Sequence, residues 1–169
     1  MVALSAALAA GGQAALGFEP QAACSDGSSG HAPLRFAGYA ALFDRRDRGG
    51  DVIRPGAFAD AAAPLPLLWQ HDPTRCIGTV EAVAEDAMGL AVVAQVDAAS
   101  ASAREVAALL RSRAIDGLSF GYRVLDAQTG TAPGPAGTPT RDLHRLALVE
   151  VSVVTHPMQP GARVETLLG

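Results

Sequence analysis

The sequence predicts a mainly β fold with attached helices, in the α+β class. Short runs rich in β-branched and aromatic residues recur between turn signals, and few segments have a helical period. The length of 169 residues is typical of one domain. Many short strands separated by turns are typical of a closed or partly closed β-barrel, or of a sandwich, with helices attached.

Four of the six predicted strands lie before residue 97. Leu34–Phe43 combines aromatic and small residues and predicts a strand. Leu65–Gln70 is a nearly continuous apolar run, which is typical of a buried strand. Ile77–Ala84 and Leu90–Val96 flank a turn at residues 85–89, so we expect them to form a hairpin.

Two helical segments are expected. Ser100–Arg113 has the clearer pattern, because Val106, Leu109 and Leu110 fall on one face of a helix of 3.6 residues per turn. A short helix is predicted from Pro55, since proline suits the first turn of a helix and alanines follow it; Pro64 would end it.

The rest of the chain divides into strands and irregular segments. Leu118–Leu125 and Leu143–Thr155 predict strands, and the Gly/Pro/Thr-rich residues 127–140 between them predict an exposed, mobile loop. Residues 1–30 end in a linker-like sequence, so we expect a flexible N-terminal extension ahead of a domain over residues 31–169.

The basic residues are unusual in kind. The count of lysine plus arginine is 13, and all of them are arginine. The absence of lysine excludes Schiff-base chemistry, a Ser–Lys dyad and a P-loop.

Net charge, cysteines and hydropathy exclude further classes. The formal net charge of −4 makes a general nucleic-acid binder less favoured. The two cysteines, Cys24 and Cys76, are too few for a disulfide scaffold or a cysteine zinc site, and two reduced thiols are expected. The apolar N-terminal run is too short and too interrupted by Gly11 and Gly12 to span a membrane, so no membrane role is expected.

Three polar residues lie within or directly beside predicted apolar strands. His71 follows a predicted strand, Ser119 lies near the start of another, and Glu150 is surrounded by apolar residues. A buried carboxylate requires a partner, and a hydroxyl nucleophile requires a base that an acceptor orients. Serine, histidine and glutamate fit the roles of nucleophile, base and orienting acceptor. Their residue types alone do not show that the three side chains meet in the fold.

A series of sequence blocks extends this interpretation to a family. In order, the blocks are Gly38-Tyr39-Ala40, Gly50-Asp51-Val52-Ile53, Pro55-Gly56-Ala57-Phe58, Leu68-Trp69-Gln70-His71-Asp72, Ile77-Gly78, Gly117-Leu118-Ser119-Phe120-Gly121-Tyr122 and Leu148-Val149-Glu150-Val151-Ser152-Val153-Val154. The series resembles the prohead (procapsid maturation) serine proteases of tailed phages with the HK97-type capsid, a family that also occurs in gene transfer agents. The resemblance covers roughly residues 34–164. It implies a fold like the herpesvirus assembly proteases, with a β-barrel ringed by helices.

The resemblance implies a role for each candidate residue. Ser119 is the nucleophile, His71 is the general base and acid, and Glu150 orients the histidine. His144 is the rival third member, because the herpesvirus relatives use a second histidine there. Backbone N–H groups near Gly121, or an arginine such as Arg141 or Arg145, are candidates for the oxyanion hole.

The resemblance also implies partners and a location. The substrates would be the major capsid protein and scaffold segments, cut inside the assembling procapsid in the cytoplasm of the bacterial host. A homodimer is compatible with this interpretation, whereas a direct nucleic-acid role is not expected. No cofactor is implied, and the spacing of the four histidines matches no metal-ligand pattern.

Simpler interpretations remain open at this point. Glu150 could pair with Arg123 or Arg145, and Asp72 could orient His71, although neighbouring strand residues point to opposite faces. Ser152 shares a strand face with Glu150 and is expected to support the site rather than attack substrate. The alternative function is a non-catalytic barrel, derived from such a protease, that acts as a capsid scaffold or interaction module.

Overall fold

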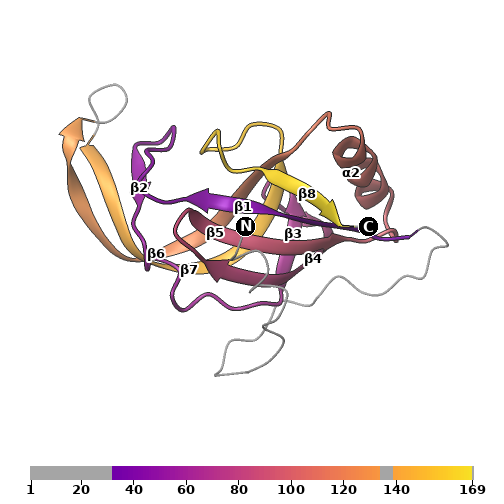
Figure 1. Cartoon of the computed structure of the whole chain (residues 1–169), viewed down its shortest axis with the longest axis horizontal. Helices are drawn as coiled ribbons and strands as arrows, with labels where there is room; N and C mark the ends of the chain where they lie inside the picture. Colours follow the sequence, from indigo (N-terminus) through magenta and orange to yellow (C-terminus); the bar gives the residue numbers. More distant parts are fainter. Residues whose placement is uncertain (1–31, 134–138, 169) are drawn as a thin grey trace.

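The computed structural model describes residues 32–133 and 139–168, without the side chains of residues 131–133. The expected extension over residues 1–30 therefore lies outside the described residues. The predicted mainly β class is confirmed (Figure 1). The elements are β1 (Leu34–Leu42), β2 (Asp51–Ile53), β3 (Leu65–Trp69), β4 (Asp72–Glu85), β5 (Gly89–Val96), α2 (Ala101–Arg111), β6 (Gly117–Pro133), β7 (Pro139–Val154) and β8 (Val164–Leu168).

The strands form one eight-stranded sheet in the order β2-β7-β3-β4-β5-β1-β8, with β6 paired to β7. The sheet is not closed into a barrel, so the expectation of a closed barrel is wrong. The start of β8 approaches β6, where Leu118 N–H donates to Ala162 O at 2.9 Å, but the pairing ends at an isolated bridge between Gly117 and Arg163. The reason is that β8 has five residues and pairs along β1 instead.

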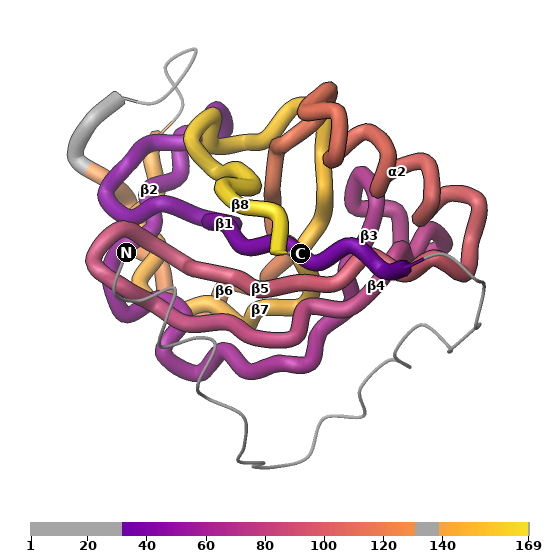
Figure 2. Tube along the Cα trace, turned by 45° about the vertical axis from the view of Figure 1, so that its right-hand side comes forward, coloured from indigo at the N-terminus to yellow at the C-terminus, as the bar shows by residue number. Residues whose placement is uncertain are grey.

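The core lies on the inner side of this curved sheet. Phe36, Leu67, Leu90, Leu118 and Val151 are completely buried there. The helix α2 packs against β4 and β5 at one end of the sheet (Figure 2). Alternation of apolar and polar residues along β6 and β7 therefore separates a core face from an opposite face, and the candidate residues lie on the opposite face.

One of the two expected helices is present. α2 begins after Ser100, whose hydroxyl accepts a hydrogen bond from Ala103 N–H at 3.0 Å, as an N-cap does. The short helix predicted from Pro55 is wrong, because the segment forms successive turns in which the Glu85 carboxylate binds the N–H groups of Gly56 and Phe58. Among the described residues, no helix is long and apolar enough to span a membrane.

The end of β6 and the beginning of β7 form a two-stranded arm that projects from the sheet (Figure 1). The expected loop over residues 127–140 is therefore wrong for residues 127–133 and 139–140, which are strands. These residues pair across the two strands, as Thr129 does with Arg141. A Gly/Pro/Thr-rich composition does not indicate such pairing. Residues 134–138 lie outside the described residues.

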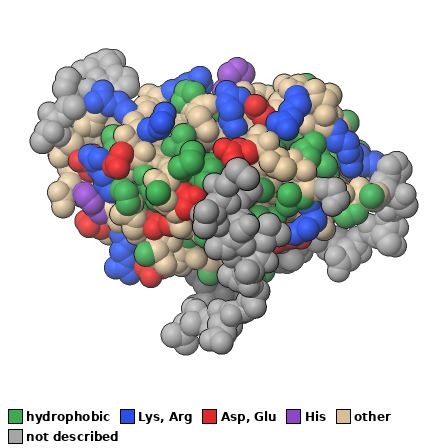
Figure 3. Space-filling model, in the orientation of Figure 1, with side chains coloured by type: hydrophobic (Ala, Val, Ile, Leu, Met, Phe, Trp, Pro, Cys, Tyr) green, Lys and Arg blue, Asp and Glu red, His purple; other side chains and the backbone are tan. Residues whose placement is uncertain are grey.

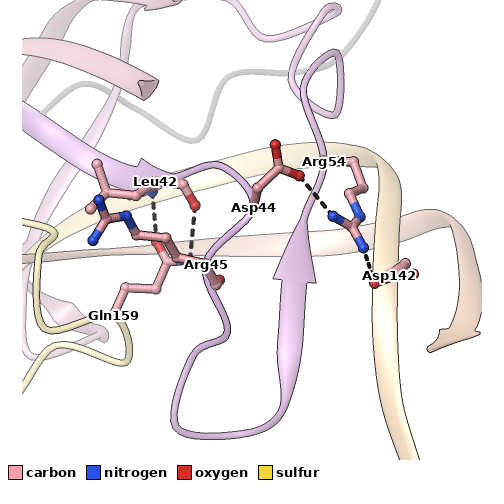
Figure 4. Close-up of polar contacts among 6 residues, drawn as sticks. All are labelled: Leu42, Asp44, Arg45, Arg54, Asp142 and Gln159. Carbon is pink, nitrogen blue, oxygen red and sulfur yellow. Dashed lines mark hydrogen bonds and ion pairs between the residues drawn. The ribbon is translucent and has the colours of Figure 1, made fainter. Parts of the chain in front are cut away.

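A buried glutamine fixes the connection between β7 and β8. The Gln159 side chain donates from Nε2 to the carbonyl oxygens of Leu42 at 3.0 Å and Arg45 at 3.1 Å (Figure 4). Its Oε1 accepts from Leu42 N–H at 2.6 Å. All these polar groups are thereby satisfied at the end of β1.

The mixed-charge loop after β1 is tied to β7 by one arginine. Arg54 donates to Asp44 at 2.8 Å and to Asp142 at 3.0 Å (Figure 4). On the face drawn in Figure 3, arginine and acidic side chains are interspersed over the surface. Opposite charges so distributed neutralise each other locally.

Cys76, in β4, is disulfide-bonded, so the expectation of two reduced thiols is wrong for this residue. The other cysteine of the chain, Cys24, lies outside the described residues. Disulfide formation depends on the approach of two Cβ atoms to about 4 Å, which separation along the sequence does not measure.

Candidate active site

His71 lies at the tip of the β3–β4 hairpin. Gln70 and His71 have φ values of 57° and 60°, and Trp69 pairs with Asp72 across the turn. Positive φ at both central residues is the pattern of a type I′ hairpin turn. Because non-glycine residues rarely adopt this conformation, contacts from outside the turn must hold it.

Those contacts come from the end of β7. Gln70 N–H donates to Val153 O at 3.0 Å, and His71 N–H donates to Ser152 Oγ at 3.2 Å. The Gln70 side chain also donates from Nε2 to Thr155 Oγ1 at 3.0 Å and accepts from Thr155 N–H at 3.4 Å. The histidine turn is therefore docked on β7 by both backbone and side-chain hydrogen bonds.

The imidazole of His71 binds the carboxylate of Glu150. His71 Nδ1 lies 2.7 Å from Glu150 Oε1, and the side chains are 43% and 9% exposed, respectively. An ionised carboxylate only accepts hydrogen bonds, so Nδ1 carries a proton. In the neutral imidazole this leaves the lone pair on Nε2, which is the tautomer that a general base requires.

The second oxygen of Glu150 is also occupied. Ser152 donates from Oγ to Glu150 Oε2 at 2.6 Å. Arg145, one of the arginines considered as a partner for Glu150, pairs instead with Asp60 at 3.2 Å. The buried carboxylate is therefore satisfied by a histidine and a hydroxyl.

Ser119 lies on the neighbouring strand, on the same sheet face as this pair. In the β6–β7 ladder Ser119 is opposite Ser152, and Gly121 is opposite Glu150. Opposed residues of an antiparallel pair share a face. Ser119 is 6% exposed, and no hydrogen bond joins its hydroxyl to another described side chain. β7 separates β6 from β3, so the two backbones that bear Ser119 and His71 are about 10 Å apart.

Gly121 makes room for the carboxylate. A Cβ atom at this position would lie 2.5 Å from Glu150 Oε1 and 3.0 Å from its Cγ. The Glu150 side chain therefore packs against the Gly121 backbone, and from there its carboxylate reaches His71.

We predict that Gly121→Ala displaces the Glu150 carboxylate. The new methyl group would overlap Oε1, so the hydrogen bond to His71 would lengthen or break. A reaction that uses His71 as its base should slow by at least about tenfold, which is the effect of losing about 1.4 kcal/mol. The measurement is cleavage rate beside wild type at equal folded concentration, and an unchanged rate would contradict the prediction.

Two other sequence candidates are not brought to this pair. His144 precedes Glu150 by six residues on β7, about 20 Å along an extended strand. Within the described part of the chain, no hydrogen bond joins His144 to His71. Asp72 is engaged with Thr74, whose N–H and hydroxyl donate to it at 2.9 and 2.7 Å and hold the pKa of this carboxyl below its usual range.

A pocket of about 290 Å³ lies beside β6. Ser119, Phe120 and Tyr122 form part of its wall, together with the charged side chains of Asp51 and Arg141. Tyr122 donates from its hydroxyl to Asp51 Oδ2 at 3.1 Å, and Arg141 binds both oxygens of Asp51 at 2.8 and 2.5 Å. Arg141, an oxyanion-hole candidate, is thus committed to Asp51.

The tyrosines are expected to titrate late. Burial, followed by the charge and hydrogen bond of Asp51, raises the pKa of Tyr122 to about 12, and burial with a hydrogen bond to Asp86 raises the pKa of Tyr39 to about 12. The stabilisation from these phenols is present below the unfolded pKa of about 10 and is lost as the pH rises through the folded values. Absorbance near 295 nm should show almost no ionisation around pH 10 in the folded chain, whereas about half of the tyrosine should be ionised at this pH in denaturant. Ionisation at pH 10 without denaturant would contradict this.

A model of the family described as "Caudovirus prohead serine protease" matches residues 23–168. The chain belongs to the prohead serine protease family. It is similar to the prohead protease of Enterobacteria phage HK97, with 30% identity over 137 residues that cover 78% of this chain and 59% of the relative. It therefore spans about three-fifths of that phage protein.

Solved structures show the fold of this prohead protease family member to be like that of herpesvirus proteases. The Kaposi's sarcoma-associated herpesvirus protease (KSHV), in complex with a hexapeptide phosphonate inhibitor, is similar with a TM-score of 0.56 and 16% identity over 82% of this chain and 66% of the other. The varicella-zoster virus protease is similar with a TM-score of 0.52 and 19% identity over 79% of this chain and 64% of the other. The predicted relation in fold is therefore confirmed.

Sequence reasoning missed two residues of this site. The sequence indicates Gly121 only as a source of an N–H group, whereas the space that it leaves for Glu150 depends on the cross-strand register. No sequence feature other than its position next to His71 indicates a role for Gln70. Among the described residues, no group of three His, Cys, Asp or Glu side chains could hold a metal ion.

Proposed function

We propose that the chain is a serine endopeptidase that cleaves capsid and scaffold segments during procapsid maturation of a tailed phage or gene transfer agent. One observation carries the proposal. The His71–Glu150 hydrogen bond lies on the same sheet face as Ser119, in a member of the prohead serine protease family.

In the proposed mechanism Ser119 Oγ attacks the scissile carbonyl carbon while His71 Nε2 takes its proton. His71 then donates that proton to the leaving amine, and a water molecule releases the acyl group from Ser119 by the same steps in reverse order. Glu150 keeps the proton on Nδ1 and stabilises the imidazolium. The mechanism requires no metal or cofactor, and lysine is absent as a competing base.

The substrates we propose are the major capsid protein and scaffold segments. The site of action would be the interior of the assembling procapsid in the bacterial cytoplasm, and a homodimer remains compatible with it.

Co-expression tests the proposal. The chain is produced in a bacterium together with the major capsid protein encoded by the same phage or agent, and the capsid protein is weighed by intact mass spectrometry. We expect a shortened capsid protein with one defined new terminus. A capsid protein of unchanged mass that still co-purifies with the chain would favour the non-catalytic interaction module instead.

A further inference from the structure

We propose that Ser152 is a positioning residue that couples the Glu150 carboxylate to the backbone of the histidine turn. The inference rests on the proposed function, because it assigns a role to Ser152 in the same reaction. It extends the expectation that Ser152 supports the site by naming the two groups that its hydroxyl joins.

The hydroxyl of Ser152 takes part in two hydrogen bonds of different kinds. As a donor it binds Glu150 Oε2 at 2.6 Å, and as an acceptor it receives His71 N–H at 3.2 Å. A serine hydroxyl has one proton to donate, so this proton is committed to the carboxylate. One atom therefore holds both the orienting carboxylate and the backbone of the residue that it orients.

Because the groups are buried, loss of these hydrogen bonds is costly. Ser152 is completely buried and Glu150 is 7% exposed, so water cannot replace the lost partners if the hydroxyl is removed. Ser152 also differs from Ser119, its cross-strand neighbour, as a candidate nucleophile, because the Ser152 hydroxyl proton is donated to Glu150. Without the hydroxyl, Glu150 would keep one partner of two, and the left-handed backbone of His71 would lose a hydrogen bond that holds it.

The probe is a fluorophosphonate, which reports on the base without a known substrate. Ser119 Oγ would form a bond to phosphorus, fluoride would leave, and His71 would take the serine proton. Saturation kinetics give the maximal labelling rate and the apparent binding constant. For Ser152→Ala we expect the maximal rate to fall about tenfold to a hundredfold with the binding constant unchanged, since Ser152 does not contact the probe.

Matched variants separate positioning from stability. Ser152→Thr keeps the hydroxyl and should recover most of the rate. Ser100→Ala also removes one serine hydrogen bond, at the N-cap of α2, so it should lower Tm by a few degrees without changing the rate. If Ser152→Ala does not accumulate as folded protein, Ser152→Cys, which keeps the volume but donates weakly, is measured with the same expectation.

Two results would overturn the role of Ser152. One is a maximal labelling rate for the alanine variant within twofold of wild type. The other is an equal loss in the alanine and threonine variants. Failure of the proposed function is distinguishable, because wild type would then not be labelled at Ser119 at all.

Discussion

Replacing Ser119 with alanine should abolish cleavage of a co-expressed capsid protein and leave the fold intact. The hydroxyl is the proposed nucleophile, and loss of a nucleophile of this kind lowers kcat by about 10⁴- to 10⁶-fold. Alanine is smaller than serine, and no described side chain loses a hydrogen bond. The capsid protein should therefore keep its full mass over a time in which wild type processes it completely.

The control for this variant is Ser112→Ala, which removes an exposed hydroxyl bonded to Leu109 O at 3.1 Å. It should cleave like wild type. Thermal unfolding of the Ser119 variant should follow that of wild type closely. Persistent cleavage by Ser119→Ala would show that the nucleophile lies elsewhere.

Replacing Glu150 with glutamine should reduce cleavage by about 10⁴-fold. The carboxylate accepts from both His71 Nδ1 and Ser152 Oγ, whereas an amide has one acceptor oxygen and an NH₂ group that donates. If the amide donates toward Nδ1, the imidazole proton moves to Nε2, and the base is in the wrong tautomer for Ser119. The measurement is kcat on a peptide that spans the mapped cleavage site.

The comparison that decides the third member is His144→Ala. Because His144 lies about 20 Å along β7 from Glu150, its loss should change kcat by less than twofold. Loss of activity in His144→Ala together with wild-type activity in Glu150→Gln would show that the histidine, and not the glutamate, orients His71.

The fold could be predicted from the sequence where local pattern and tertiary contact agree. The hairpin of β4 and β5 and the helix α2 are examples, since their apolar residues have the period of the element they form. The arm of β6 and β7 could not be predicted, because its order comes from pairing between strands of polar and Gly/Pro-rich composition. The helix prediction for the segment after Pro55 was wrong for a similar reason, since the Glu85 carboxylate of β4 binds N–H groups of this segment.

The candidate site could likewise be predicted only where a local sequence pattern determines it. That Glu150 and Ser152 share a face follows from the period of two along a strand, and their hydrogen bond agrees with it. That Gly121 lies under the Glu150 carboxylate depends on the register between β6 and β7. The docking of Gln70 on Thr155 depends on the parallel pairing of β3 with β7, which no local pattern reports.

The most direct measurement is the location of a phosphonyl group after fluorophosphonate treatment of the chain. Trypsin cuts this lysine-free chain only at arginines, so Ser119 is the one serine of the peptide 114–123, and Ser152 lies in the separate peptide 146–163. Our account predicts the added mass on the peptide 114–123 in wild type, and its loss in His71→Ala. Added mass on the peptide 146–163, or on neither peptide, would contradict it.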